Sequence, residues 1–531
     1  VEARVRQLWA DEFEIDPALV GADASFFDLG GHSLTAIRLV NSVREEFGVE
    51  YPVARFYEQP TLGAMARYLA VNGDGDGSES SGSNGTAADV LGRAPVTAQQ
   101  SAFITRHLTH PRPEIYNVAM RLTFTGALDV PALRAALTQL VARHEALRTR
   151  LVQDEATGEW WQEALRPRPV ELPEEDLVAC PDPADVADAE AEAERLAAET
   201  AAEPFDIRAE LAPVLRLLRT GADRWALLFV LHHSACDGWS VSVLLRELAA
   251  LYRAEVTGEP HGLPESVPQP SEYARWQQDR SRTQDRGRLV DYWARELAGA
   301  PFDLALPLDR PRPEQLSGEG DVVLFTVGSA VRTGVEALAR RHRTTPFAVT
   351  AAALARLVAK VTGEQDVVLG ISYANRERRE FEALAACTVS SFTLRVRGGE
   401  AETFGALVDQ VARGVVGAID HAAPIRAVAE ELREALGVEV PDRLPLGFQY
   451  QSSLDTDIEL PGVTTAVEDL AVPGARSEFN FGLIPTGDVL SGYLEYSTDL
   501  WDRATVEAWT TAYVDLLAES VTAPGQGEGE G

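Results

Sequence analysis

Two adjacent histidines followed by an acid and a glycine form the part of this sequence best suited to proton transfer. His232 and His233 stand just before Asp237 and Gly238 in the pattern HHxxxDG. An imidazole titrates near neutral pH and can take a proton from a reacting group. A neighbouring carboxylate can orient that imidazole, and a glycine leaves its backbone N–H open to a substrate. The spacing therefore predicts an acid–base site within one short turn.

The residues on either side predict the elements that position this turn. An apolar run from Trp225 to Leu231 comes first, and apolar residues at helical spacing follow, namely Val241, Leu244, Leu245, Leu248 and Tyr252. This pattern is typical of a buried strand, a tight polar turn and an amphipathic helix.

Three other interpretations use the same residues. Paired histidines beside a strand often have a structural role. A zinc site would need about four converging ligands, which neighbours on one turn rarely provide; its members would be His232, His233, Cys236 and Asp237. Cys236 is a poor candidate nucleophile, because burial in an apolar turn raises the pKa of a thiol and leaves it inert.

A serine near the N-terminus is the second residue with a predicted chemical role. Ser33 follows Gly30, Gly31 and His32 and comes just before a predicted helix. Two glycines let the backbone turn sharply, and a serine in this position commonly caps a helix. The motif offers Ser33 no acid or base partner besides His32, so Ser33 is a poor self-activated nucleophile. We therefore interpret Ser33 as a substrate for a transferase.

Composition divides the chain into a small helical part, a linker and a larger α/β part. Residues 1–71 carry three apolar stripes at helical spacing, which suffice for a compact bundle. Residues 72–93 are rich in Gly, Ser, Asp and Asn, as in flexible linkers, and would span about 25 Å as a random coil. From residue 94 onward strand-like and helical runs alternate, which favours an α/β unit in two lobes, residues 94–265 and 266–523.

Charge and cysteine content restrict the partners and the compartment. A formal net charge of −34 repels nucleic acid and anionic membranes, so we expect small molecules or proteins as partners. No apolar run is long enough to span a membrane, and the first residues begin a helical pattern rather than a signal peptide. Cys180, Cys236 and Cys387 are widely spaced with no CxxC pair, which predicts neither a disulfide framework nor a structural zinc site. We therefore expect a cytoplasmic protein.

Both chemical motifs resemble those of non-ribosomal peptide synthetases. The string HHxxxDGxS at residues 232–240 is similar to the motif of condensation domains and, more loosely, to that of chloramphenicol acetyltransferase. The string DxxFFxLGGHSL at residues 23–34 resembles the phosphopantetheine attachment site of peptidyl carrier proteins. Further family matches lie at residues 97–100, 143–151, 271–276 and 445–450. The resemblance implies a small all-α four-helix carrier bundle followed by a two-lobed, chloramphenicol acetyltransferase-like α/β domain.

The sequence also departs from the family pattern in places. Ser101 stands where the family usually has arginine, and Thr388, Ser390 and Ser391 fall within a segment that reads FVNTL in the family. Residues 421–424 are a degraded form of HQDxPFE. We expect these departures to affect the acceptor pocket and the second lobe more than the histidine turn.

The resemblance implies a role for each residue of the turn. His233 would face the reacting amine and thioester, either as the base or by positioning the amine and stabilising the intermediate, and His232 would be structural. Asp237 would hold the turn through an arginine, for which Arg376 of the second lobe is the candidate. Gly238 would let the substrate approach its backbone.

The resemblance also implies a cofactor and protein partners. A phosphopantetheinyl transferase would attach phosphopantetheine to Ser33, giving an arm that carries an acyl thioester. This acyl donor would react with an aminoacyl group on a downstream carrier, and adenylation domains of the same synthetase would be neighbours. Because residues 524–531 hold no second GGxS motif, we expect the acceptor carrier to act in trans and the chain to be a piece of a longer synthetase.

Three related functions compete with condensation. An epimerising relative typically follows a carrier that reads GGDS, whereas this chain has GGHS at residues 30–33. A heterocyclising relative replaces the histidines by aspartate, which this chain does not. A non-catalytic recruitment domain would tolerate loss of the motif, which is intact here.

Overall fold

The computed structural model describes most of residues 1–72 and nearly all of residues 90–522. In the first part the positions left out are 14, 18, 19, 23, 27, 28, 30–34, 36–38, 40, 41, 44, 45, 48–50, 52–55, 57 and 58. In the second part they are 156, 179–182, 304, 377, 399–402, 423–427, 442, 443 and 452–457. Ser33 and most of the predicted linker therefore lie outside the described residues.

The N-terminal part is packed around a buried tryptophan. Trp9 lies on α1 (Glu2–Phe13), and its indole N–H donates to Met65 Sδ at 3.4 Å. Met65 belongs to α4 (Leu62–Asn72). The rings of Phe26 and Phe56 meet Trp9 edge-on, with centroids 6.0 and 6.2 Å away. These contacts confirm the small helical core that the apolar stripes predict.

The histidine turn, residues 232–238 and called the HH turn below, follows a central strand of a five-stranded sheet. The sheet has the order β12-β2-β7-β6-β5. Its strands are β2 (Asn117–Gly126), β5 (Glu174–Asp176), β6 (Val214–Gly221), β7 (Arg224–His232) and β12 (Val463–Asp469). Both neighbours of β7 run antiparallel to it, and β5 runs parallel to β6.

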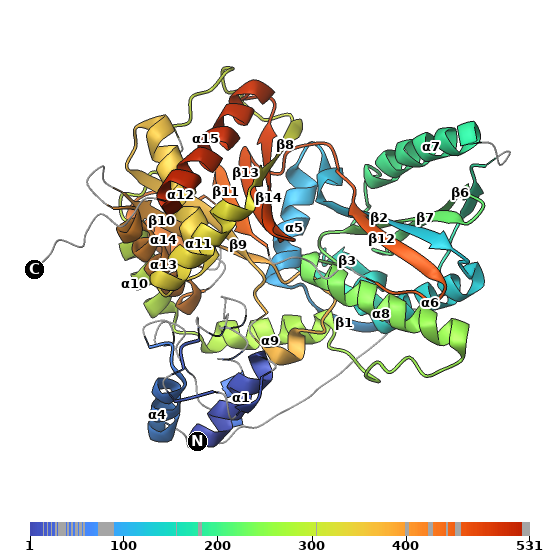
Figure 1. The fold of residues 1–531 in the computed structure, drawn as a ribbon, viewed down its shortest axis with the longest axis horizontal. Coiled ribbons are helices and arrows are strands. Elements are labelled where there is room, and N and C mark those ends of the chain that lie inside the picture. Colours follow the sequence, from blue (N-terminus) through green and yellow to red (C-terminus); the bar gives the residue numbers. More distant parts are fainter. Residues whose placement is uncertain are drawn as a thin grey trace, which may run out of the picture.

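Helices cover both faces of this sheet (Figure 1). Alternate side chains of β7 point to opposite faces. Leu227, Phe229 and Leu231 share a core with α6 (Val130–Arg143) and α8 (Gly238–Thr257). Leu228, with Ala226, packs instead against α7 (Pro183–Ala201). The uninterrupted apolar run before the HH turn is therefore a strand covered on both sides.

The second lobe is a six-stranded sheet with the order β10-β9-β11-β13-β14-β8. Its strands are β8 (Gly320–Val327), β9 (Asp366–Tyr373), β10 (Ser390–Arg397), β11 (Leu446–Tyr450), β13 (Phe479–Thr486) and β14 (Val489–Ser497). β11 runs parallel to β9 and β13, and the other neighbours are antiparallel. Between residues 320 and 373 the chain forms a strand, two helices and a strand, which agrees with the alternation of strand-like and helical runs in the sequence.

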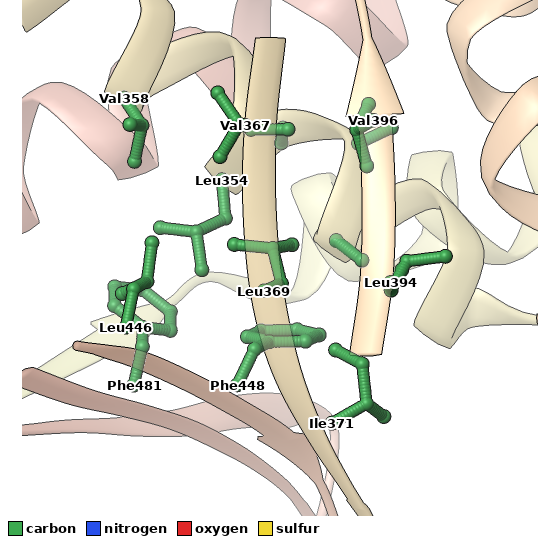
Figure 2. Packing of buried hydrophobic residues seen from close by; sticks show 14 of the residues in the cluster. Leu354, Val358, Val367, Leu369, Ile371, Leu394, Val396, Leu446, Phe448 and Phe481 are labelled. Carbon is green, nitrogen blue, oxygen red and sulfur yellow. The ribbon is translucent and has the colours of Figure 1, made fainter. Parts of the chain in front are cut away.

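Long helices pack on the second sheet. They are α11 (Ser329–Arg341), α12 (Pro346–Thr362), α13 (Phe404–Asp420) and α15 (Arg503–Thr522). Figure 2 shows Leu354 of α12 among Val367, Leu369 and Leu446 of the strands, all part of one buried cluster. Among the described residues, no single helix has the length and apolarity of a membrane span, although α11 and α12 pass that test together as a pair bent by 108°.

Smaller elements connect these layers. A three-stranded sheet has the order β1-β4-β3, formed by β1 (Val90–Pro95), β4 (Trp160–Leu165) and β3 (Thr149–Gln153). Further helices are α5 (Ala98–Thr109), α9 (Pro270–Thr283), α10 (Arg286–Leu297) and α14 (Ala429–Leu436). Short 3₁₀ turns occupy residues 113–116, 145–148 and 379–381. β1 begins inside the stretch predicted as linker, because its backbone pairs with β4.

One strand joins the two lobes directly. β12 comes from the C-terminal half of the chain but pairs antiparallel with β2 of the first sheet, with Val463 opposite Gly126 and Asp469 opposite Met120. Arg121 of β2 and Glu468 of β12 form an ion pair of 2.7 Å across this register. The first sheet is therefore completed only by residues far downstream.

Candidate active site

The HH turn is fixed where α8 begins. Asp237 is the N-cap residue of α8, with extended backbone angles of φ −134° and ψ 179°. Its side chain accepts a hydrogen bond from the Ser240 N–H at 2.8 Å, and its carbonyl accepts one from Val241 at 3.0 Å. A further backbone bond of 2.9 Å, from Ala235 N–H to His232 O, closes the turn. The carboxylate predicted from sequence thus starts the helix itself.

Both carboxylate oxygens of Asp237 accept hydrogen bonds, and its side chain is completely buried. Oδ1 accepts from Arg376 Nη2 at 3.0 Å as well as from Ser240. Oδ2 accepts from the Thr388 N–H at 2.9 Å, with the Thr388 hydroxyl at 3.0 Å. Burial alone would raise the pKa of Asp237, but Arg376 and the hydrogen bonds from Thr388 and Ser240 hold that pKa below its usual range. Asp237 is therefore a fixed anion that does not exchange protons near neutral pH.

Arg376 connects the HH turn to the second lobe. Its side chain is 1% exposed, and its Nη1 donates to the carbonyls of Phe381 and Leu384 at 2.7 and 2.8 Å. Its guanidinium carbon lies 5.7 Å from the ring centroid of Trp239. These contacts wrap the segment between β9 and β10 around one cation, so the ion pair with Asp237 joins the two lobes beneath the turn.

His232 points away from solvent. His232 is 1% exposed. Its Nδ1 accepts a hydrogen bond from the Ser234 N–H at 3.2 Å, and the Ser234 hydroxyl lies 2.7 Å from the same nitrogen. Its Nε2 lies 3.2 Å from Nδ1 of His107, a residue of α5. Burial, together with the neighbouring imidazoles of His107 and His233, lowers the pKa of His232 to about 3. Its ring is neutral and has hydrogen-bond partners on both nitrogens.

His233 is the partly exposed histidine of the pair. Its N–H donates to Tyr116 O at 2.8 Å, and its ring stacks on Phe103 with centroids 4.6 Å apart and planes 20° apart. Its Nδ1 lies 3.8 Å from Cys387 Sγ. Burial and then the guanidinium of Arg476 lower the pKa of His233 to about 4, against hydrogen bonds to the backbone and the charge of Asp237, which raise it. The turn therefore presents a neutral, oriented imidazole that can accept a proton.

Two family models together cover most of the chain. The model described as "Condensation domain" matches residues 90–530, which include the HH turn and Arg376. This chain belongs to the condensation-domain family. The model described as "Phosphopantetheine attachment site" matches residues 3–69, which include Ser33. The chain is thus a carrier followed by a condensation domain, of the type found in non-ribosomal peptide synthetases.

The relatives that match over nearly the whole chain are far longer proteins. The chain is 34% identical over 527 residues to a protein of Salinispora arenicola named "Probable non-canonical nonribosomal peptide synthetase (NRPS) CymA", covering 95% of this chain and 6% of that protein. It is 31% identical over 526 residues to "Malpinin synthetase" of Mortierella alpina, covering 98% of this chain and 7% of that one. The chain therefore spans less than a tenth of the length of either relative.

Solved structures share the fold of the condensation domain. The X-domain from teicoplanin biosynthesis superposes with a TM-score of 0.70 at 25% identity, covering 83% of this chain and 97% of that one. The first condensation domain of the calcium-dependent antibiotic synthetase gives a TM-score of 0.66 at 20% identity, covering 82% of this chain and 98% of that one. These similarities, with the helices and sheets described above, confirm the predicted carrier and two-lobed α/β fold.

The structure brings five of the six predicted site residues together. His232 and His233 end β7 or follow it directly, Asp237 and Gly238 begin α8, and Arg376 reaches them from the second lobe. Gly238 is partly exposed at the first position of α8, where helix N–H groups have no partner within the helix. Ser33 lies outside the described residues.

The carrier part is suited to phosphopantetheine on chemical grounds. Attachment needs a hydroxyl as the acceptor of the group, which a serine supplies, and the described residues after Ser33 include helical, buried Thr35 and Leu39. Ser33 is the residue that would hold the group, and it lies within the matched attachment site. Among the described residues, no group of three or more His, Cys, Asp or Glu side chains could hold a metal ion.

The sequence did not reveal several residues of this condensation site. Phe103 and His107 lie one helical turn apart on α5, and Arg476 acts on His233 from the second lobe. Thr388 departs from the family pattern, yet it holds Asp237 rather than affecting only an acceptor pocket. The i, i+4 spacing of Phe103 and His107 after the 97–100 motif was the one available signal, since the other contacts join distant segments.

Cys236 has no catalytic geometry. It is buried, its Sγ lies 3.8 Å from the carbonyl of His232, and burial raises the pKa of its thiol well above the usual value. A thiol in this state is inert as a nucleophile. We therefore interpret Cys236 as a buried structural residue of the condensation domain.

Proposed function

We propose that this chain is an acyltransferase that joins an acyl group carried on Ser33 to the amine of an aminoacyl group on a downstream carrier. The observation that carries the proposal is the arrangement of the HH turn. His232 and Asp237 have all their ring or carboxylate positions occupied by the protein, whereas His233 is neutral and partly exposed. His233 is therefore the group in the turn left to meet a substrate.

The reaction requires a neutral amine and a place for one proton. An α-amine has a pKa of about 8, so part of it is neutral near pH 7. A phosphopantetheine arm on Ser33 would supply the acyl group as a thioester. The amine nitrogen forms the new C–N bond as the C–S bond breaks, and the proton lost by nitrogen ends on the leaving sulfur.

His233 has a defined role in that proton transfer. Because its pKa is lowered to about 4, its imidazole is neutral at the working pH but is a weak base. An imidazole with a pKa of about 4 loses an added proton readily near pH 7. It is also less efficient as a general base than a group whose pKa lies near the operating pH. We therefore assign His233 the role of a hydrogen-bond acceptor that orients the attacking amine and passes the proton on. Asp237 and Arg376 keep the turn in place and hold no proton of the reaction.

Loading of the carrier is tested by mass. Incubation with coenzyme A and a broad-specificity phosphopantetheinyl transferase should add one phosphopantetheine to the wild type and none to Ser33→Ala. Modification that survives Ser33→Ala would remove Ser33 from the proposal. Adenylation domains and the downstream carrier are the other partners that this function requires.

Condensation itself is tested in a single turnover. The donor is loaded on Ser33, an aminoacyl carrier is added, and product is followed by mass. His233→Ala should slow product formation by about 10²-fold or more, the usual effect of losing an acid–base group. The matched control is His261→Ala, because His261 is an exposed histidine of the same lobe. Equal rates for His233→Ala and His261→Ala with several amines would exclude His233 from the reaction.

A recruitment role is the second candidate. One similar structure, at 26% identity and a TM-score of 0.67, is named "Complex of the X-domain and OxyB from Teicoplanin Biosynthesis". By analogy, this domain would bind a partner protein instead of forming a bond. The same single turnover decides between the two, since a recruitment domain would give no product with any donor and acceptor pair.

A further inference from the structure

We propose that His107 is a positioning residue for the HH turn, which it holds by accepting a hydrogen bond from Nε2 of His232. This inference rests on the proposed function of His233, because His232 precedes His233 in the HH turn. It begins from one contact, the 3.2 Å separation between His107 Nδ1 and His232 Nε2.

The direction of this hydrogen bond follows from the other side of the His232 ring. The backbone N–H of Ser234 points to His232 Nδ1 at 3.2 Å, and an N–H can only donate. The Ser234 hydroxyl, 2.7 Å from the same Nδ1, then donates to it as well, since a hydroxyl can serve as donor or acceptor. His232 Nδ1 therefore carries no proton. A neutral imidazole holds its proton on the other nitrogen, so His232 is protonated on Nε2 and donates to His107 Nδ1. His107 thus fixes both the tautomer and the rotation of the His232 ring.

One face of α5 supports both histidines of the pair. Phe103 and His107 are four residues apart and so lie on the same side of the helix. Phe103 stacks on the His233 ring, and His107 meets the His232 ring edge-on with centroids 5.1 Å apart. A movement of this face would shift the two imidazoles together.

The acceptor role requires a neutral His107. A proton on its Nδ1 would set two N–H groups against each other across 3.2 Å. The charged groups that face His107 from other elements are Asp206, which favours the proton, and Arg208, which opposes it, while His232 faces it from the HH turn. Burial is the largest influence and lowers the pKa of His107. His107 is therefore neutral near pH 7, and its protonated form gains only as the pH falls below 6.5.

Two substitutions separate positioning from mere space filling. His107→Gln keeps an acceptor that does not titrate, and His107→Leu fills the space without an acceptor. We expect single-turnover condensation at pH 7.5 to stay within about 3-fold of wild type for His107→Gln and to fall about 10-fold for His107→Leu, the scale of one lost hydrogen bond. Because the pKa of His107 is lowered, we also expect the wild-type rate to fall more steeply than that of His107→Gln as the pH falls below 6.5. Equal rates for the two variants, or parallel pH profiles for wild type and His107→Gln, would overturn the proposal.

A second measurement does not depend on condensation activity. In the full chain labelled with ¹⁵N-histidine, the His232 signals are identified by their loss in His232→Gln. We expect a protonated Nε2 and a bare Nδ1 in the wild type and in His107→Gln, and a changed tautomer balance in His107→Leu. An Nδ1-protonated His232 in the wild type would refute the inference about His107. A correct tautomer in a chain without any condensation activity would refute the proposed function instead.

Discussion

Replacing Arg376 by methionine tests the ion pair that joins the HH turn to the second lobe. The two side chains are 1% and 0% exposed, so Arg376→Met leaves the Asp237 carboxylate buried without its counter-ion. Breaking such a pair by removing one partner costs about 3–5 kcal/mol in the free energy of unfolding. The carbonyls of Phe381 and Leu384 also lose their donor. We expect a loss at the upper end of that range.

The pH dependence of this loss identifies its cause. In the wild type the pKa of Asp237 is lowered, so the stability it contributes is present above the unfolded pKa and is lost only in strong acid. Without Arg376, we expect burial, the largest influence on this carboxyl, to raise the pKa of Asp237 above its unfolded value. The stability gap between wild type and Arg376→Met should then shrink as pH falls from 8 to 5, by up to about 1.4 kcal/mol per pH unit below the raised pKa.

Urea unfolding measures the gap at each pH. Tryptophan fluorescence is a suitable signal, because Trp239 lies beside Arg376. The control is Arg282→Met, since Arg282 and Asp279 form an ion pair in which both side chains are at least 70% exposed, and such pairs contribute about 0–1 kcal/mol. Adding Asp237→Asn to Arg376→Met should recover part of the loss. A gap below about 1 kcal/mol, or one that stays constant from pH 8 to pH 5, would refute the account of Asp237 as a fixed anion.

Two further predictions concern acid stability and a tight backbone contact. Because the pKa of His232 is lowered to about 3, the unfolded chain takes up a proton in mild acid that the folded chain does not. The stability that the neutral His232 contributes is therefore complete above about pH 6.5 and falls toward pH 4. The urea midpoint of the wild type should drop more than that of His232→Gln between pH 7 and pH 5. Gly474 has φ +136°, and a Cβ at this position would lie 2.5 Å from Ile115 Cγ2. Gly474→Ala should therefore lower the melting temperature, and it should slow condensation by displacing Arg476, whose Nε donates to Ile115 O. An unchanged melting temperature would contradict this prediction.

The sequence was most informative where structure is local. The strand before the HH turn and the helix after it follow from the spacing of apolar residues within one short window, and β7 and α8 confirm both. The resemblance to condensation domains supplied the expectation for Arg376, which stands 139 residues from Asp237. The spacing of apolar residues cannot predict a contact between two residues so far apart in the sequence.

Contacts between distant segments account for what the sequence left out. Thr388 differs from the family pattern by residue type, but its backbone N–H is the donor that Asp237 Oδ2 accepts, and any residue other than proline supplies that donor. His107 has an ordinary place on an amphipathic helix, and only the packing of α5 against the HH turn shows its partner. The pairing of β12 with β2 was likewise not predicted, since strand partners across lobes have no local signature.

The insertion of β12 into the first sheet has a consequence during synthesis on the ribosome. β2 ends at Gly126, and its partner begins only at Val463, roughly 340 residues later. At about 5–20 residues per second, translation needs roughly 20–70 s to cover that distance. Throughout that interval one edge of β2 has free N–H and C=O groups that invite pairing with other chains. We therefore expect the nascent first lobe to need a chaperone until β12 emerges, and a chain truncated before residue 463 should aggregate even though every residue of the HH turn is present.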